Sequence, residues 1–434
     1  MLQRLHTTDI GPARAMALEF GPRLNVLTGD NGLGKSFVLD LLWWVLAGDW
    51  AGAKAIPSGD QPRLDYAGAG EQGTATFQAT FQFQRQLWSW QSARGRGPRG
   101  SVIYVGAEHL AAFVMGRNRF PAAFGEDKDT GDPLAFVFEG RELWDGKVDE
   151  EGRPVCNGLI RDWVNWMRSR PVGPVDEGRA QPLVPFELLE RVLAVLSPDD
   201  AHPFKAAAPR RVTIEDSREI PTLRTPWDAE PVPVTLASAG VRRVLELAYA
   251  LVWTWHEHIQ AAELRKVSRQ KELFILIDEP ETHLHPRWQR TILPAVLELA
   301  KILDPSLELQ LFVTTHSPIV LASLETIVRE QSDRLFHFDV DDSGVEVRRL
   351  PWVKHGDAVG WLGSEAIDLR GGGRSVEAVR AIRWADAFML GKLDEIEEPA
   401  MRDKDALESE LRRVLAGDDE YWTYWLVPRG DVAQ

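Results

Sequence analysis

The pattern of apolar and polar positions after residue 238 predicts an alternation of helices and strands. The expected elements are a helix at 240–265, a strand at 273–277, a helix at 287–303, a strand at 309–314 and a helix at 318–328. Strands that alternate with helices are typical of a parallel sheet, because each helix carries the chain back to the edge where the next strand begins. This part of the chain is therefore expected to form the parallel lobe of an α/β protein.

The first 110 residues predict a second lobe, with antiparallel strands. Residues 1–28 contain two or three short strands, and an apolar helix is expected at 37–48. Residues 74–88 alternate between apolar and polar side chains, as in a half-buried strand or one arm of a hairpin. The apolar residues 101–107 predict a fully buried strand.

The remaining segments have weaker patterns. Residues 110–234 mix Pro- and Gly-rich turns with expected helices at 156–169 and 185–196 and a polar hairpin near 210–224, which suggests an inserted, mostly helical lobe. Residues 334–350 predict a hairpin that turns at Asp342-Ser343-Gly344. The expected division is 1–109 and 235–350 for the two halves of one α/β domain, 110–234 for the inserted lobe and 351–434 for a helical C-terminal region.

Composition and charge exclude several classes of protein. No apolar run approaches the roughly 20 residues that cross a bilayer, and the N-terminus has no signal-peptide core. The single cysteine, Cys156, excludes an internal disulfide and a cysteine zinc cluster, so we expect a cytoplasmic protein that is not in a membrane. The net charge of −15 disfavours a surface coated for DNA, although the basic loop at 92–100 leaves a local contact with nucleic acid open.

The sequence GDNGLGKS matches the phosphate-binding pattern G-x-x-x-x-G-K-[ST] at every position. It follows an apolar strand and precedes a helix, which is where this loop must lie to surround a phosphate with backbone N–H groups. Lys35 is expected to reach the β- and γ-phosphate oxygens, and Ser36 to bind Mg²⁺. The candidate nucleotide-binding residues in this segment are Gly29, Asp30, Asn31, Gly32, Leu33, Gly34, Lys35, Ser36 and Phe37.

Two further strand ends carry polar side chains suited to phosphate chemistry. The strand at 273–277 ends in Asp278 and Glu279, at the edge of a parallel sheet where ligands bind. Asp278 is expected to hold Mg²⁺ through water, and Glu279 to orient and deprotonate the attacking water. His316 follows the strand at 309–314 and lies 37 residues after Glu279, which leaves room for one helix and one strand. We expect its imidazole to donate a hydrogen bond to a γ-phosphate oxygen.

The segment TLASAGVRR opens the helix expected at 240–265. Ser238 is a suitable N-cap, and the free N–H groups and dipole of the helix start favour an anion. On its own, this segment indicates only a well-capped helix.

The four motifs together resemble ABC-type ATPases in order and spacing: the phosphate loop, Ser238-Ala239-Gly240, the Asp278-Glu279 strand end and His316. EPETHLHP and TTHSP resemble more narrowly the OLD, RecF and SMC branch. The OLD-like ATPases of bacterial anti-phage systems, of the Septu or PARIS type, are most similar in size and in their Ser-x-Gly signature. The resemblance covers about residues 1–110 and 235–335.

This resemblance implies an α/β P-loop NTPase, an ABC-ATPase head with a parallel lobe, an N-terminal antiparallel lobe and an inserted helical lobe. It implies ATP and Mg²⁺ as cofactors, and a homodimer in which Ser238 and Gly240 contact the γ-phosphate held by the other protomer. A separately encoded nuclease or toxin effector is also expected, and the resemblance leaves a higher oligomer open. The implied role is an ATPase switch in phage defence.

The chain departs from the family pattern at three places. Ala239 stands where the signature usually has glycine, Glu108 and His109 stand where a lid glutamine is expected, and no aromatic residue before Phe20 is available to stack on adenine. Asp339-Val340-Asp341 is an Asp-x-Asp of the kind found in TOPRIM nucleases, but no Gly-x-x-Glu strand precedes it after His316. We therefore expect an ATPase without its own nuclease.

Two other functions remain alternatives at this point. The first is a RecF-like DNA-repair or DNA-clamp ATPase, which double-stranded DNA would stimulate with a steep salt dependence. The second is the motor subunit of a transporter, which EPETHLHP and the long insertion disfavour.

Overall fold

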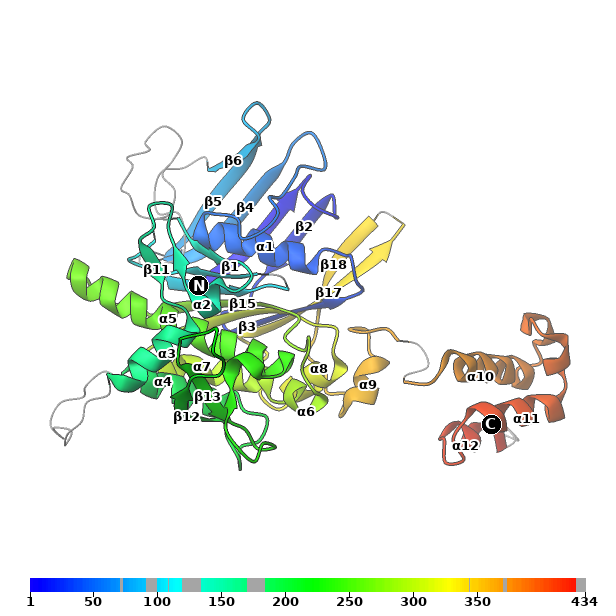
Figure 1. The fold of residues 1–434 in the computed structure, drawn as a ribbon. Coiled ribbons are helices and arrows are strands. Elements are labelled where there is room, and N and C mark those ends of the chain that lie inside the picture. The colour runs from blue at the N-terminus through cyan, green and yellow to red at the C-terminus, as the bar shows by residue number, and fades with distance from the viewer. Residues whose placement is uncertain are drawn as a thin grey trace. The chain divides into compact units, whose positions relative to one another are not determined.

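The apolar runs expected to be buried strands lie side by side in one sheet of the computed structural model (Figure 1). The structure describes residues 1–70, 73–90, 100–107, 109–118, 134–169, 184–342, 344–369 and 373–426. The central strands are β3 (Leu24–Gly29), β16 (Glu308–Thr314), β15 (Glu272–Asp278) and β7 (Gly100–Val105), in that spatial order. All neighbouring pairs among them are parallel, which confirms the predicted parallel lobe.

Further strands extend this sheet at both edges. Beside β3 lies β17 (Asp333–Asp341), which is parallel to β3, followed by β18 (Gly344–Leu350) in the predicted hairpin. At the other edge, β8 (Leu110–Phe113) and β9 (Phe136–Phe138) are antiparallel additions to β7. Within the described residues the sheet has eight strands, and the first part of the expected insertion belongs to it.

A second sheet, wholly antiparallel, is formed by N-terminal residues. Its spatial order is β2 (Ala15–Glu19), β1 (Leu2–Thr8), β4 (Arg63–Gly70), β5 (Gly73–Gln82) and β6 (Leu87–Trp90). The alternating segment 74–88 is therefore two strands and not one. The chain reverses after Gln82 because Gln86 adopts a left-handed backbone, with φ of 54°, and its N–H donates to Gln82 O at 2.8 Å.

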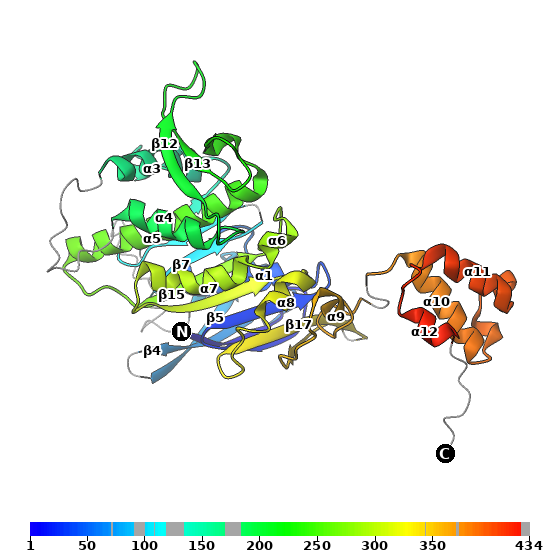
Figure 2. The same cartoon turned by 90° about the horizontal axis from the view of Figure 1, so that it is seen from below.

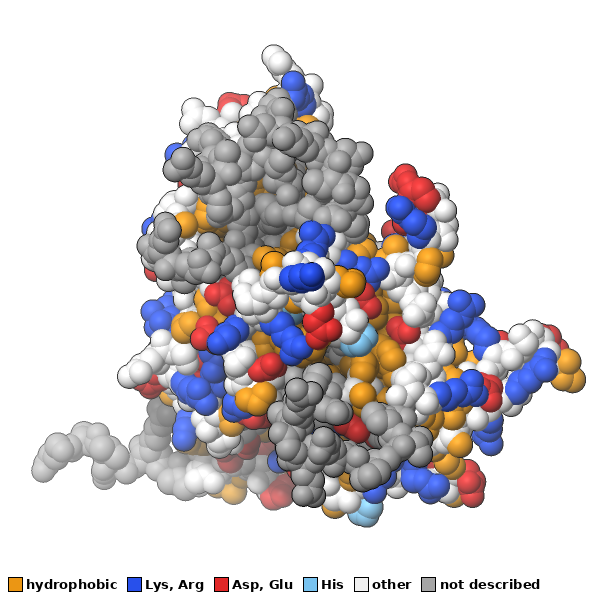
Figure 3. All heavy atoms as spheres, turned by 90° about the vertical axis from the view of Figure 1, so that its left-hand side faces the viewer, with side chains coloured by type: hydrophobic (Ala, Val, Ile, Leu, Met, Phe, Trp, Pro, Cys, Tyr) orange, Lys and Arg blue, Asp and Glu red, His pale blue; other side chains and the backbone are white. Residues whose placement is uncertain are grey.

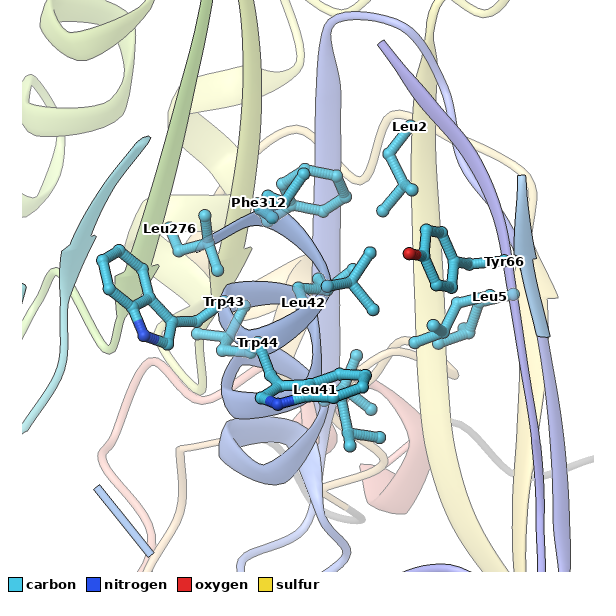
Figure 4. Close-up of a cluster of buried hydrophobic side chains, with 14 of the residues drawn as sticks. Leu2, Leu5, Leu41, Leu42, Trp43, Trp44, Tyr66, Leu276 and Phe312 are labelled. Atoms are coloured by element: carbon cyan, nitrogen blue, oxygen red, sulfur yellow. The ribbon is translucent and has the colours of Figure 1, made fainter. Parts of the chain in front are cut away.

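Helix α1 (Lys35–Ala47) lies between the two sheets (Figure 4). Its apolar residues point in all directions, so both sheets can bury them, and Leu41, Leu42 and Trp43 are almost fully buried. Trp44 stacks on Trp90 of the antiparallel sheet with ring centroids 4.3 Å apart. This packing fixes the helix that follows the phosphate loop and, with it, the loop itself.

Helices α5 (Ala239–Arg265), α7 (Ile292–Leu303) and α8 (Pro318–Leu324) cover the other face of the central sheet (Figure 2). The prediction of a single helix at 287–303 is wrong, because the structure has α6 (Pro286–Gln289) followed by a separate α7. Pro294 explains the break, since in a continuous helix its ring would meet the carbonyl of Arg290 and remove a hydrogen bond. As the third residue of α7, it is tolerated in the first turn.

The described part of the segment before α5 mixes helices and hairpins. It contains α2 (Glu142–Asp145), β10 (Lys147–Val148), β11 (Pro154–Cys156), α3 (Leu159–Arg168), α4 (Pro185–Val195), β12 (Lys205–Arg210), β13 (Ile220–Arg224) and β14 (Val232–Pro233). Helix α3 begins three residues later than expected because 154–156 is a strand. The polar hairpin is present, with its first strand starting at residue 205.

The chain divides into two compact units, residues 1–361 and 362–434, with α9 (Ala358–Leu362) at the division. The second unit contains α10 (Val376–Met389), α11 (Lys404–Val414) and α12 (Tyr421–Leu426), as expected for a helical C-terminal region. It has its own core, which includes Trp384, Leu407, Leu411 and Trp425. Across the part of the chain that the structure describes, no helix combines the length and the apolar character needed to cross a bilayer.

Candidate active site

The phosphate loop connects β3 to α1 and is shaped by close backbone contacts. Gly29 has φ of 123°, and a Cβ there would lie 2.1 Å from the carbonyl oxygen of Phe338, so only glycine fits. Gly34 has φ of 95° and lies against Pro12. Lys35 is almost fully buried, and its Nζ donates to the carbonyl oxygens of Gly29 at 3.0 Å and Asp30 at 2.6 Å. The lysine is thus held inside the turn of the loop.

The other predicted members of the loop have different surroundings. Asp30 and Asn31 are exposed, Leu33 packs against the hydrophobic core, and the ring of Phe37 lies against Gly11. Gly32 has φ of 80° with open space around it, as expected where a backbone must face a ligand.

Three strand ends meet beside this loop. Ser36 Oγ donates to Asp278 Oδ1 at 3.0 Å, and Thr314 Oγ1 donates to the same oxygen. Asp278 is 6% exposed. A serine hydroxyl beside a buried carboxylate offers the hard oxygen atoms that Mg²⁺ prefers, so these residues fit that ion. Thr314 was missed by sequence reasoning, although its place at the end of β16, two residues before His316, was the available signal.

Glu279 and His316 come together at the open side of this cluster. Their atoms Oε1 and Nε2 are 3.5 Å apart, and both side chains are partly exposed. Glu279 has a left-handed backbone, with φ of 47°, and its N–H donates to Thr314 Oγ1 at 3.0 Å. Thr282 Oγ1 donates to Glu279 Oε2 at 3.2 Å. Thr314 therefore links the two acidic residues, since it donates to one and accepts from the other.

Burial and neighbouring charges shift the protonation equilibria here. Burial lowers the pKa of Lys35, while Glu279 and Asp278 oppose that shift. Burial also lowers the pKa of His316. The nearby charge of Lys35 lowers this pKa further, whereas the charge of Glu279 raises it. His316 is therefore expected to be neutral at pH 7, with one ring N–H available as a donor.

Asp40 is a charged residue of the site that sequence reasoning also missed. It lies four residues after Ser36 on α1, where it accepts a hydrogen bond from Tyr104 OH at 2.9 Å. Burial raises its pKa to about 6, and the charge of Asp278 adds to the shift. The available signal was a single acid within the apolar sequence FVLDLLWW.

Ser238 caps α5, and its Oγ accepts from the N–H of Val241 at 3.4 Å. Gly240 has a structural requirement of its own, because a Cβ there would lie 2.8 Å from the carbonyl oxygen of His283. Both residues border a pocket of about 580 Å³. The described residues that line it are Pro198, Asp199, Pro226, Trp227, Ser238, Gly240, His283, His285, Arg287 and Trp288, and none of them belongs to the phosphate loop.

The Asp-x-Asp pair lies in the β17–β18 hairpin, where Asp339 Oδ2 accepts from Arg348 Nη2 at 2.9 Å. Within the described ranges, no group of three or more His, Cys, Asp or Glu side chains is arranged to hold a metal ion. Glu108 and most of the basic loop at 92–100 lie outside the described residues. On the face drawn in Figure 3, the described basic and acidic side chains are interspersed.

Comparison with known proteins places this chain in a family. The family described as "AAA domain, putative AbiEii toxin, Type IV TA system" matches residues 181–322, and one described as "AAA domain" matches residues 4–100. The Septu protein PtuA of Bacillus thuringiensis is 34% identical over 383 residues, which cover 85% of this chain and 83% of that protein. The chain belongs to the Septu PtuA family.

Solved structures of SMC heads are similar at a lower level. The SMC head domain from Thermotoga maritima gives a TM-score of 0.40 at 15% identity, covering 81% of this chain and 99% of that one. An Smc head domain from Pyrococcus furiosus, bound to the C-terminal domain of ScpA, gives 0.42 at 12% identity, covering 81% and 96%. The predicted resemblance to Septu-type ATPases is confirmed by the family matches, and the observed sheets agree with the predicted ABC-type α/β fold.

Proposed function

We propose that this chain binds and hydrolyses ATP with Mg²⁺ and acts as the ATPase switch of an anti-phage defence system. The observation that carries the proposal is the meeting of Lys35, Ser36, Asp278, Glu279 and His316 at the carboxyl ends of three adjacent parallel strands. Ligands of open α/β sheets bind at this edge.

Each residue has a role that follows from its surroundings. Lys35 and the loop N–H groups bind the β- and γ-phosphates, and Ser36 and Asp278 hold Mg²⁺, which neutralises phosphate charge when bound. Glu279 accepts a proton from the attacking water, because its carboxylate is partly exposed and lies on the open side of the buried Asp278. His316, neutral and 3.5 Å from Glu279, donates to the γ-phosphate.

A second copy completes the site in this proposal. Ser238 and Gly240 lie at the start of a 27-residue helix that borders an open pocket, so its free N–H groups are accessible to an anion from outside the protomer. The γ-phosphate held by one protomer would contact Ser238 of the other, and ATP would close the dimer. Hydrolysis would reopen it.

The role in defence rests on membership of the Septu PtuA family. A separately encoded nuclease or toxin would be the effector that the closed and open states control.

Lys35→Ala should abolish ATP binding, measured by calorimetry, and ATP turnover, measured as phosphate release. Lys301→Ala, at an exposed lysine on α7, should change neither.

In cells that also carry the gene of the proposed effector, Lys35→Ala should abolish protection against phage, measured as plaque formation. Near-normal ATP affinity in this variant would contradict the phosphate-loop assignment. Loss of ATP binding with intact protection would contradict the defence role of the ATPase. Strong stimulation by double-stranded DNA that falls steeply with salt would favour the RecF-like alternative.

A further inference from the structure

Glu281 accepts three hydrogen bonds beside the site, yet no role described above uses it. It lies two residues after Glu279, on the turn that follows β15. Its Oε1 accepts from Thr315 Oγ1 at 2.8 Å, from the N–H of His316 at 2.8 Å and from the N–H of Ser317 at 3.1 Å. One carboxylate oxygen therefore holds three consecutive residues around the histidine.

A second contact ties the same loop to the same segment. Ser317 Oγ donates to Gln289 Oε1 at 2.8 Å, and Gln289 Nε2 donates to the carbonyl oxygen of Leu284 at 3.0 Å. Ser317 also caps α8 by accepting from the N–H of Val320. The loop at 315–317 is thus fixed at both ends, and Glu281 is the contact nearest to the histidine.

The carboxylate is held here against an electrostatic penalty. Burial raises the pKa of Glu281, and the charge of Glu279 raises it further, while the hydrogen bonds from the loop lower it. The second oxygen, Oε2, is buried and has no hydrogen-bond partner among the described residues. A buried acid with a charged acidic neighbour is an unfavourable choice for packing alone.

The contact matters because the ring of His316 must lie within hydrogen-bond reach of its target. A misplacement of about 1 Å in such a group costs on the order of 10²-fold in rate. The backbone of His316 is positioned directly by Glu281, and its ring is 3.5 Å from Glu279.

We propose that Glu281 is a positioning residue that holds His316 in place for ATP hydrolysis. The inference rests on the proposed ATPase function, and it predicts a loss of turnover without a loss of binding. Glu281→Ala should lower kcat by about 10- to 100-fold, with ATP affinity unchanged. Glu281→Gln retains an acceptor at Oε1 and should recover most of the lost rate.

The comparison with His316→Ala separates positioning from general damage. The double variant Glu281→Ala with His316→Ala should be no slower than His316→Ala alone, because both changes remove the same interaction. Glu298→Ala, at an exposed glutamate on α7, is the matched control and should turn over like the parent. Additive losses in the double variant would overturn the proposal.

Hydrogen exchange provides a readout that does not depend on turnover. The amides of His316 and Ser317 should exchange on the order of tenfold faster in Glu281→Ala, and close to the parent rate in Glu281→Gln. A parent protein that hydrolyses no ATP would refute the proposed function, and the exchange rates would still decide whether Glu281 holds His316 in place. Unchanged exchange at both amides would refute it, and so would a Glu281→Gln variant whose turnover is as slow as that of Glu281→Ala.

Discussion

Replacement of Glu279 by Gln should separate ATP binding from ATP hydrolysis in the proposed function. The glutamine keeps the length of the side chain and an oxygen that can accept from Thr282, but it cannot take a proton from water. Loss of a general base costs about 10²- to 10⁴-fold in rate, which corresponds to about 2.7–5.5 kcal/mol of barrier. His316 stays in place, because its backbone is held by Glu281 and not by Glu279.

Binding should survive this change and can become tighter. Glu279 is the largest of the charges that raise the pKa of Lys35, so it is a negative group close to the lysine that must meet the phosphate. Removing it leaves Lys35 free of that competing charge. If ATP binds the closed dimer more tightly than the separate protomers, ATP at 100 times its Kd for the closed dimer stabilises that state by at most about 2.7 kcal/mol per site.

Phosphate release and size-exclusion chromatography with light scattering, each with and without ATP and Mg²⁺, would check this prediction. We expect slow release together with an ATP-dependent gain in mass, and Glu298→Gln as a surface control should match the parent in both. Turnover within threefold of the parent would contradict the role of Glu279. Slow turnover with no gain in mass would contradict the two-copy site.

Four other outcomes follow from the structure. Gly29→Ala should lower the free energy of unfolding by about 2–5 kcal/mol in urea titrations, because the new Cβ would overlap the carbonyl of Phe338 at a positive φ; a loss below 0.5 kcal/mol would contradict this packing. Ser238→Arg should prevent the ATP-dependent gain in mass while leaving ATP binding to the separate protomer intact, as calorimetry would show. The raised pKa of Asp40 means that the folded state holds this proton more strongly, so its contribution to stability is complete below about pH 4 and is lost as pH rises through about 6. Asp40→Asn should remove that dependence and stabilise the protein at pH 8 by at most about 3 kcal/mol, less after solvent screening. Urea unfolding at pH 5 and pH 8 would check this, and the reasoning is wrong if the free energies of unfolding of parent and variant differ by the same amount at both pH values. The purified chain alone should not cut supercoiled DNA with Mg²⁺ or Mn²⁺. Cleavage that disappears in Asp339→Ala would contradict this prediction and indicate a nuclease site at the Asp-x-Asp pair.

The sequence by itself determined the parts of this protein that depend on neighbouring residues in the chain. A strand that ends in Gly29 and a helix that begins at Lys35 are local consequences of an apolar run, a glycine turn and a second apolar run. The same holds for Asp278 and for the strand before His316, since polar residues at the ends of buried strands must reach the sheet edge. The strand–helix alternation then implies that these ends meet on one side.

The tertiary structure alone decided which of these groups touch. Thr314 and Asp278 are 36 residues apart in sequence, and His316 and Glu281 are 35 apart, so no local pattern pairs them. Their contacts depend on β15 and β16 being neighbours in register, with Asp278 opposite Thr314. The strand pair at 73–90 was hidden for a related reason. Alternation records which side chains are buried, whereas the reversal at Gln82 is a change of backbone direction that leaves the alternation intact.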